Sequence, residues 1–268
     1  YTITGRGYAS VARDPWMRLI RGVAPLFNRF VADDANTRWM VENKADIAQS
    51  GLQAAHRDGR VDVVGGAGVA TEIFSASPLP PRPPLRVGFV ARLIWTKGLD
   101  IAVRAVALAR ERGCDVTLTI AGEVDPNNPR AFTKKDLESY AAMPGIRLAG
   151  KVDDVPAFWR QHHIAFLPSR GCEGMPRSLL EAASCGRPIL TTRVPGCEEL
   201  AEVTNGWSVP SENVDAAADA LIEIAARTDL HERGLRARSA IEAGFSEAKL
   251  WEAAERCHFG ETARAAQP

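Results

Sequence analysis

The fold is decided by residues 169–183, which read SRGCEGMPRSLLEAA. Residues 164–168 before them, IAFLP, are apolar and predict a short buried strand. Gly174 permits a tight turn, and Pro176 suits the start of a helix, where its missing N–H is not needed. A strand, a turn and a helix in this order are typical of a parallel α/β sheet.

The same stretch predicts chemistry, because it places Glu173 and Glu181 on either side of the helix start. We expect Glu173 in the loop and Glu181 one to two turns into a helix over residues 177–185. The free N–H groups of the turn and the positive end of the helix dipole can hold an anion. Two carboxylates beside them can hold hydroxyls, and phosphate with hydroxyls describes a nucleotide sugar. An arbitrary pair of glutamates at a helix start is more often a cap and a solvated charge.

Strand-like and helical segments alternate from about residue 85 onward. This alternation predicts a doubly wound parallel sheet, in which ligands bind off the carboxyl ends of the strands. The expected strands are 86–91, 116–121, 146–149, 164–167, 188–192 and 207–209, and the expected helices are 99–112, 133–142, 155–162, 178–185 and 213–227. Six residues follow strand ends and are expected at one edge of the sheet: Arg92, Lys97, Gly122, Glu123, Arg170 and Glu173.

Several short motifs surround the first stretch in a fixed order. Together they resemble the nucleotide-sugar half of the family-4 glycosyltransferases, which have the two-domain GT-B fold. The resemblance covers roughly residues 60–245. It implies an α/β protein of GT-B type, with a doubly wound parallel Rossmann-like C-terminal domain plus an incomplete N-terminal Rossmann-like domain. The matching segments are Ala91–Leu93, Lys97–Gly98, Gly122–Glu123, Glu173–Ala182 and Gly186–Ile189.

The resemblance implies a retaining, hexosyltransferase-type enzyme that moves a sugar from a nucleoside diphosphate sugar to a glycan or lipid-linked acceptor. It implies that Glu181 accepts hydrogen bonds from ribose hydroxyls, and that Glu173 contacts the donor sugar or its developing oxocarbenium charge. The loop over residues 123–130 is similar to a subgroup that extends bacterial cell-surface polysaccharides on polyprenyl diphosphate carriers.

Sugar transfer builds negative charge on the departing diphosphate, and this charge must be stabilised where it develops. No Asp-x-Asp motif follows a strand, so we assign the task to Arg92 and Lys97 and expect neither metal nor cofactor. The backbone amides around residues 175–179 are expected to help. The predicted catalytic residues are Arg92, Lys97 and Glu173, and the predicted substrate-binding residues are Gly122, Glu123, Val152, Gly174, Met175, Pro176, Arg177, Ser178, Leu179 and Glu181.

Some of these assignments leave alternatives open. Gly122 lets the backbone approach the ligand, and the backbone near Val152 is expected to recognise the base. Glu123 either holds hydroxyls or is a solvated loop charge. Arg177 either adds a third phosphate contact or faces water.

The composition limits the classes of partner and the cellular compartment that we expect for this protein. The 33 basic and 33 acidic residues give a formal net charge of zero, so no overall field favours nucleic acid. Five cysteines form no C-x-x-C pair and are odd in number, which predicts reduced thiols in the cytoplasm. No apolar run approaches the roughly 20 residues that span a bilayer.

The organisation is expected to have four parts. Residues 1–64 are a partial N-terminal acceptor-side domain, because they are too few for a complete Rossmann-like domain. Residues 65–84, rich in glycine and proline, are an interdomain linker. Residues 85–245 bind the nucleotide sugar, and residues 246–268 form a C-terminal helix and tail that return to the first domain. We therefore expect a chain truncated at its N-terminus.

Two segments suggest contacts outside the donor site. Trp16, Leu19, Ile20, Val23, Phe27 and Phe30 recur at helical spacing beside arginines. This pattern fits either peripheral contact with the inner face of the plasma membrane or a core helix with arginines facing water, and Pro25 is expected to interrupt or bend the helix. In the last helix, which Ser246 is expected to cap, Trp251 is a candidate interdomain anchor.

Other functions compatible with the sequence are a catalytically incomplete nucleotide-sugar binding fragment, a glycogen-type phosphorylase and a nucleotide-sugar epimerase. A phosphorylase requires a lysine-bound pyridoxal phosphate, and donor binding without turnover would indicate the binding fragment.

Overall fold

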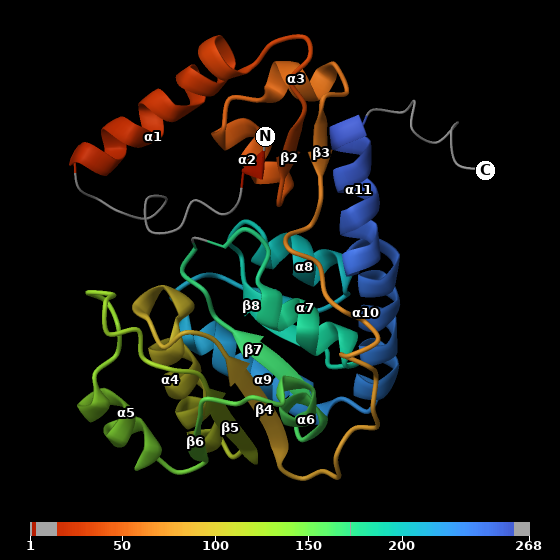
Figure 1. Ribbon diagram of the computed structural model, residues 1–268. Helices are drawn as coiled ribbons and strands as arrows, with labels where there is room; N and C mark the ends of the chain where they lie inside the picture. The colour runs from red at the N-terminus through yellow and green to blue at the C-terminus, as the bar shows by residue number, and fades with distance from the viewer. Residues whose placement is uncertain (1, 4–14, 172, 260–268) are drawn as a thin grey trace.

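The computed structural model describes residues 2–3, 15–171 and 173–259. Cys172 and the predicted tail at 260–268 lie outside the described residues. The chain forms two parallel β-sheets, and in Figure 1 the smaller sheet lies above the larger one, with helices around both. This architecture confirms the predicted α/β class.

The larger sheet has six parallel strands in the order β6-β5-β4-β7-β8-β9. The chain moves from β4 outward to β6 and then crosses back to β7, which is the predicted doubly wound topology. Strand order reverses between β4 and β7, and ligands bind beside such switch points. The strands are β4 (Leu85–Val90), β5 (Val116–Ala121), β6 (Ile146–Gly150), β7 (Ile164–Leu167), β8 (Ile189–Thr192) and β9 (Trp207–Val209).

Helices cover both faces of this sheet, and every residue of β7 and β8 is buried as a result. Helix α4 packs against α9, and α7 packs against α10. The predicted ends of these strands and helices fall within two residues of the observed ends, as expected where helix ends fray. The helices are α4 (Leu99–Glu111), α5 (Lys134–Ala141), α6 (Val155–Arg160), α7 (Arg177–Ser184), α8 (Cys197–Val203), α9 (Val214–Ala226) and α10 (Leu230–Gly244).

The smaller sheet has three parallel strands in the order β1-β2-β3. Its alternation of strands and helices has the Rossmann-like character that the sequence led us to expect. It has a separate small core made of Trp39, Val41, Ile47, Leu52 and Ala55. Its elements are β1 (Thr2–Ile3), β2 (Trp39–Val41), α2 (Lys44–Gln49), α3 (Gln53–Arg57) and β3 (Val61–Val63).

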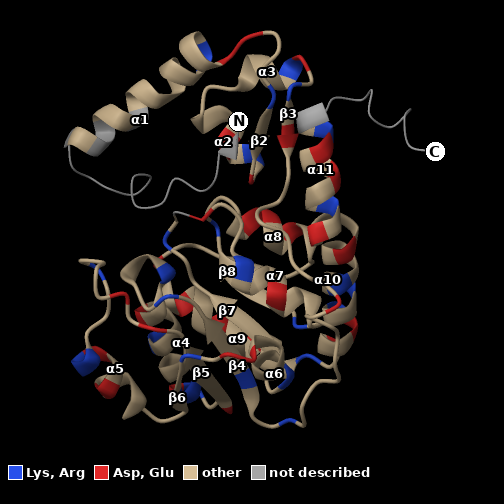
Figure 2. Cartoon of the chain, viewed as in Figure 1, with Lys and Arg blue, Asp and Glu red and all other residues tan. Residues whose placement is uncertain are grey.

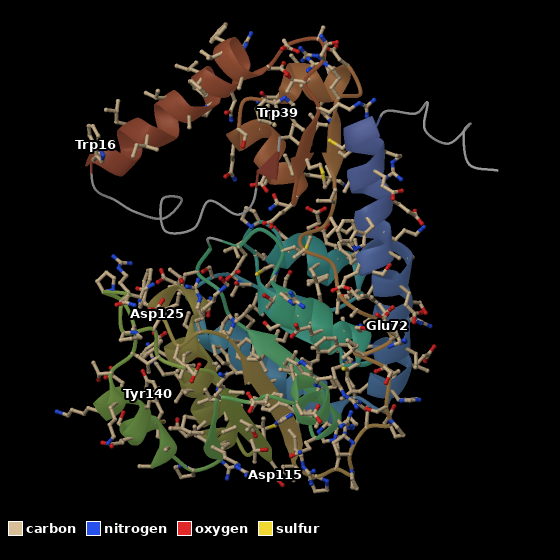
Figure 3. All side chains as sticks on the ribbon, in the orientation of Figure 1. Trp16, Trp39, Glu72, Asp115, Asp125 and Tyr140 are labelled. Carbon is tan, nitrogen blue, oxygen red and sulfur yellow. The ribbon has the colours of Figure 1, made fainter. Side chains whose placement is uncertain are left out.

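Helix α1 (Pro15–Phe27) extends outward from the smaller sheet (Figure 1). Pro25 lies inside it, and the chain continues into a π-helix at Asn28–Ala32, so the helical path does not end at the proline. Trp16 is 67% exposed on its outer side, whereas Trp39 in the small core is 3% exposed (Figure 3). Among the described residues, the apolar side chains of α1 belong to neither hydrophobic core.

Buried polar side chains hold the segment between the two sheets. Fully buried Arg187 donates from Nη2 to the carbonyl of Pro78 at 3.1 Å. The Nε2 atom of His163 forms a hydrogen bond of 2.9 Å with the carbonyl of Pro80. These contacts bind the proline-rich segment to the larger sheet.

The C-terminal helix α11 (Glu247–Phe259) returns to the smaller sheet, where it contacts β2 (Figure 1). Ser246 Oγ accepts a hydrogen bond of 3.4 Å from the Lys249 N–H, so Ser246 caps the helix as expected. Trp251 is 69% exposed, whereas Ala253 is buried. The prediction that Trp251 anchors the two parts was wrong, because the helix turns Ala253 inward instead.

Candidate functional site

A cleft of about 410 Å³ lies at the carboxyl ends of β4, β5 and β6, beside the start of α7. This is the edge at which doubly wound sheets bind ligands. Its lining includes most of the predicted site residues: Arg92, Lys97, Gly122, Glu123, Val152, Glu173, Met175, Pro176, Arg177 and Ser178.

Lys97 and Glu173 form an ion pair within this cleft. The Nζ atom of Lys97 lies 2.7 Å from Oε1 and 2.8 Å from Oε2 of Glu173. Ser169 Oγ donates a further hydrogen bond of 2.8 Å to Oε1. The two charged side chains are 19% and 6% exposed, so water screens this pair less than a surface pair.

Arg92 occupies the more open rim of the cleft. Its side chain is 66% exposed, and Nη1 lies 3.5 Å from Oδ2 of Asp125 in the loop after β5. Both predicted cations therefore lie in the cleft, each beside a carboxylate.

The first turn of α7 supplies backbone donors. Pro176 is the residue before the helix, and Arg177 and Ser178 begin it and line the cleft. The Leu179 N–H instead donates to the Pro176 carbonyl at 3.0 Å, and the Leu179 side chain is buried in the main core. The structure thus places Leu179 beneath the cleft and not in its wall.

Glu181 lies one turn further along α7. Its Oε1 accepts a hydrogen bond of 3.0 Å from Nε of Arg177. Burial raises the pKa of Glu181 above its ordinary value, and the Arg177 guanidinium partly opposes that shift. Glu181 lies outside the residues that line the cleft, behind Arg177. The Arg177 side chain is 59% exposed, lines the cleft and is paired with Glu181.

Two glycines shape the cleft through close backbone contacts. A Cβ on Gly122 would lie 1.9 Å from the Ala91 carbonyl oxygen, and its φ is 149°. Gly174 lies outside the lining, and its carbonyl oxygen accepts a hydrogen bond of 3.0 Å from Nδ2 of Asn43. Asn43 also caps α2, so the smaller sheet contacts the loop that carries Glu173.

Sequence reasoning missed Lys151 and Asn43. Lys151 lines the cleft directly after β6, so the rule that identified Arg92 and Lys97 could have found it. Asn43 is separated from Gly174 by 131 positions and carried no local signal.

Cys197 lies behind the cleft and is fully buried. Burial raises its pKa to about 12, so its thiol is protonated at neutral pH and unsuited to act as a nucleophile.

Comparison with known proteins identifies the family. The model for "Glycosyl transferases group 1" matches residues 84–227, more than half of the chain. The chain belongs to the glycosyl transferases group 1 family. The matched residues contain all of the larger sheet and the whole cleft.

Among relatives in this family, AmsK of Erwinia amylovora, an amylovoran biosynthesis glycosyltransferase, is 28% identical over 173 residues. That match covers 61% of this chain and 42% of AmsK. WcaL of Escherichia coli (strain K12), whose name connects it with colanic acid biosynthesis, is 32% identical over 193 residues, covering 67% of this chain and 46% of WcaL. The chain thus spans less than half the length of either relative.

Solved glycosyltransferase structures share the fold. Alr3699/HepE of Anabaena in complex with UDP superposes with a TM-score of 0.75 at 18% identity, covering 98% of this chain and 72% of that one. Sucrose-phosphate synthase of Thermosynechococcus elongatus gives a TM-score of 0.72 at 17% identity, covering 99% and 68%. At these identities the likeness shows the fold, which is the predicted GT-B type.

The described residues bring together no group of three or more His, Cys, Asp or Glu side chains that could hold a metal ion. None of the described helices is both long and apolar enough to cross a bilayer.

Proposed function

We propose that this chain is the donor-binding part of a retaining, metal-independent glycosyltransferase. The enzyme transfers a sugar from a nucleoside diphosphate sugar to a glycan or polyprenyl-diphosphate-linked acceptor in bacterial cell-surface polysaccharide synthesis. The observation that carries the proposal is the cleft with Arg92, Lys97 and Lys151 beside the start of α7. Membership of the family, the polysaccharide names of AmsK and WcaL and the UDP complex of Alr3699/HepE support it.

The residues have distinct roles in this proposal. Arg92 and Lys97 receive the diphosphate, and the N–H groups of Arg177 and Ser178 add fixed dipoles, so the leaving charge is stabilised where it develops. Glu173, which is paired with Lys97 in the cleft, contacts the sugar of the donor. Glu181, ionised, accepts hydrogen bonds from the ribose, and Gly122 keeps the backbone close to the ligand.

Titration calorimetry with UDP and GDP tests the donor site. Arg92→Ala and Lys97→Ala should each weaken binding of the preferred diphosphate by about tenfold or more, because a charge-assisted hydrogen bond contributes roughly 1.5–3 kcal/mol. Arg104→Ala, at an exposed position of α4 outside the cleft, is the matched control. Unchanged affinity in both cleft variants would refute the assignment. The anomeric configuration of the product tests whether the enzyme is retaining. Turnover in the presence of excess chelator tests whether it is independent of metal.

We also propose that the enzyme works in the cytoplasm at the inner face of the plasma membrane, with α1 as the contact. Figure 2 shows α1 almost free of acidic colouring, and apolar side chains of α1 and of the π-helix that follows it are exposed. The exposed set is Trp16, Leu19, Ile20, Val23, Leu26 and Phe27 on α1, with Phe30 and Val31 on the π-helix. Cosedimentation with anionic phospholipid vesicles should fall in a Trp16→Ser, Phe30→Ser double variant, and equal cosedimentation would contradict the contact.

A further inference from the structure

Asn43 lies at the point where the smaller sheet meets the loop that carries Glu173. It follows β2 at the start of α2, and it is 1% exposed. Its Oδ1 accepts a hydrogen bond of 3.1 Å from the Asp46 N–H, which caps α2. Its Nδ2 donates a hydrogen bond of 3.0 Å to the carbonyl of Gly174. A single buried amide therefore connects the smaller sheet to residues 173–176, which we call the donor loop.

The two partners of this amide fix its orientation. If the amide were turned over, its oxygen would face the Gly174 carbonyl and its nitrogen would face the Asp46 N–H, so both hydrogen bonds would be lost. Serine or aspartate would cap the helix about as well as asparagine does. The Nδ2 donor is therefore the part of Asn43 that a cap does not require, and it is directed at the donor loop.

The Gly174 carbonyl lies in closely packed surroundings. A Cβ on Gly196, in the turn before α8, would lie 1.8 Å from this carbonyl oxygen. A Cβ on Gly66, in the segment between the two sheets, would lie 2.7 Å from the Cβ of Met175. A buried carbonyl that loses its donor costs free energy unless it finds another. The neighbouring backbone leaves little room for one, so loss of the Asn43 donor should displace the donor loop.

The donor loop places two groups in the cleft, one on each side of Gly174. Glu173 and Met175 both line the cleft, and Oε1 of Glu173 lies 2.7 Å from Nζ of Lys97. The peptide between Gly174 and Met175 is trans, and the carbonyl and N–H of a trans peptide point in opposite directions. The bond to Asn43 therefore turns the Met175 N–H away from Asn43. The position of one carbonyl thus governs a carboxylate and a backbone donor.

We propose that Asn43 is a positioning residue of the donor site. From the smaller sheet it holds the Gly174 carbonyl, and through it the Glu173 carboxylate, in the place where that carboxylate contacts the sugar of the donor. The contact with the sugar rests on the proposed function, whereas the ordering of the donor loop by Asn43 does not. Asn43 acts through Glu173 and does not itself touch the substrate.

Titration calorimetry on the full chain separates the sugar from the rest of the donor. The measured quantity is the affinity for a nucleotide sugar relative to its free diphosphate, with UDP-glucose and UDP and with GDP-mannose and GDP as probes. Asn43→Ser keeps the cap but loses the donor to Gly174, and it should lower this ratio by about tenfold, the size of one lost charge-assisted contact. In a Glu173→Gln background the same substitution should lower it less than about threefold, because the positioned carboxylate is absent.

Two further variants complete this measurement. Asn43→Asp also keeps the cap but replaces the Nδ2 donor by an acceptor, so it should lower the ratio at least as much as Asn43→Ser. Asn213→Ser is the matched control, because Asn213 caps α9 with a hydrogen bond of 2.9 Å from the Ala216 N–H and lies outside the cleft. It should leave the ratio unchanged.

A second measurement needs no donor. The chain has four methionines, and the methyl signal of Met175 in a chain labelled with carbon-13 at its methionine methyls reports the surroundings of the donor loop. Loss of that signal in Met175→Leu assigns it. Both Asn43 variants should shift or broaden the Met175 signal, because the loop moves, and should leave the signal of Met143, which follows α5, unchanged. Asn213→Ser should change neither signal.

Three calorimetric results would overturn the positioning role: a ratio within twofold of wild type in both Asn43 variants, an equal fall in Asn213→Ser, or an equal fall with and without the Glu173 carboxylate. An unchanged Met175 signal in both Asn43 variants would also overturn it. Failure of the proposed function appears separately, as a wild-type chain that binds neither UDP nor GDP. In that case the Met175 signal still decides whether Asn43 orders the donor loop.

Discussion

The ammonium nitrogen of Lys97 lies 2.7 Å from Oε1 of Glu173, 76 positions away in the sequence. The cation that we assign to the diphosphate is thus paired with the carboxylate that we assign to the sugar. A diphosphate in the cleft has to compete with Glu173 for Lys97 or share it. The pair neutralises part of the positive charge that the cleft presents to a donor.

Replacing Glu173 by glutamine should therefore separate binding from turnover. Glu173→Gln keeps the side-chain size but removes the charge that competes for Lys97, so UDP affinity should rise, by about threefold to tenfold. Turnover of a nucleotide sugar should fall, because the proposed function assigns Glu173 to the reacting sugar. Calorimetry and product formation measure the two effects.

Glu123→Gln is the control for this substitution, since Glu123 lines the same cleft but is not the carboxylate paired with Lys97. It should change UDP affinity only slightly. If Glu173→Gln weakened UDP binding as much as Lys97→Ala, competition between the carboxylate and the diphosphate would be excluded.

Two glycines that flank α4 offer a second prediction. Gly98 precedes the helix with φ 73°, and a Cβ there would lie 1.9 Å from the Pro168 carbonyl oxygen. Gly113 follows it with φ 85° and has open space around a Cβ. Gly113→Ala should cost about 1 kcal/mol of unfolding free energy, from backbone strain alone. Gly98→Ala should cost about 3 kcal/mol or more, because the clash adds to the strain.

Urea unfolding compares the two variants directly. Gly98→Ala should also weaken UDP binding, since Gly98 adjoins Lys97 and its clash displaces that loop. Equal losses of stability in the two variants would show that the Pro168 contact relaxes without cost.

The larger sheet was predictable because each strand is a short apolar run and each connection carries glycine, proline or charge. Most of the cleft was predictable for a geometric reason: residues that follow parallel strands meet at one edge. The burial of Leu179 could also have been read from the sequence, because Leu179, Leu180 and Ala183 recur on one face of α7.

The pairing of Lys97 with Glu173 could not be predicted in this way, because it depends on three-dimensional distances and on burial, which residue type alone does not fix. The pairing of Arg177 with Glu181 could have been predicted, because the two residues are four positions apart on a helix. Asn43 caps α2 beside the smaller sheet, and Gly174 lies between β7 of the larger sheet and α7, so their hydrogen bond depends on how the two sheets are arranged.

Buried His162 predicts a pH dependence of stability. Its Nδ1 lies 2.7 Å from the Phe158 carbonyl, and burial lowers its pKa from 6.5 to about 4. The unfolded chain therefore binds the proton more tightly than the folded one. Stability should be fully present above pH 6.5 and be lost as the pH falls toward 4, by about 3 kcal/mol.

Urea unfolding between pH 7 and pH 4 measures this loss. His162→Gln keeps a hydrogen-bond donor but does not titrate, so its free energy of unfolding should depend less on pH. His231→Gln, at an exposed position of α10, is the control and should keep the wild-type slope. Parallel pH profiles for wild type and His162→Gln would exclude His162 as the source.

The pair of Arg177 and Glu181 predicts how donor binding depends on pH. In the proposed role, Glu181 accepts hydrogen bonds from ribose best when ionised. Burial raises its pKa and Arg177 opposes this shift, so Arg177→Ala should raise that pKa further. UDP affinity should then decline with falling pH in every chain that has Glu181, and the decline should begin at a higher pH in Arg177→Ala.

Calorimetry from pH 8 to pH 5 gives the UDP dissociation constant of each variant. Dividing it by the wild-type value at the same pH removes the effect of the titration of the UDP phosphate itself. Arg177→Lys retains the positive charge and should stay close to wild type. Glu181→Gln should bind UDP more weakly at pH 8 and lose part of the dependence on pH, because its side chain cannot ionise. If the ratio for Arg177→Ala stayed constant across this range, Glu181 would not be the titrating contact, and the ribose would have to be held by another group of the cleft.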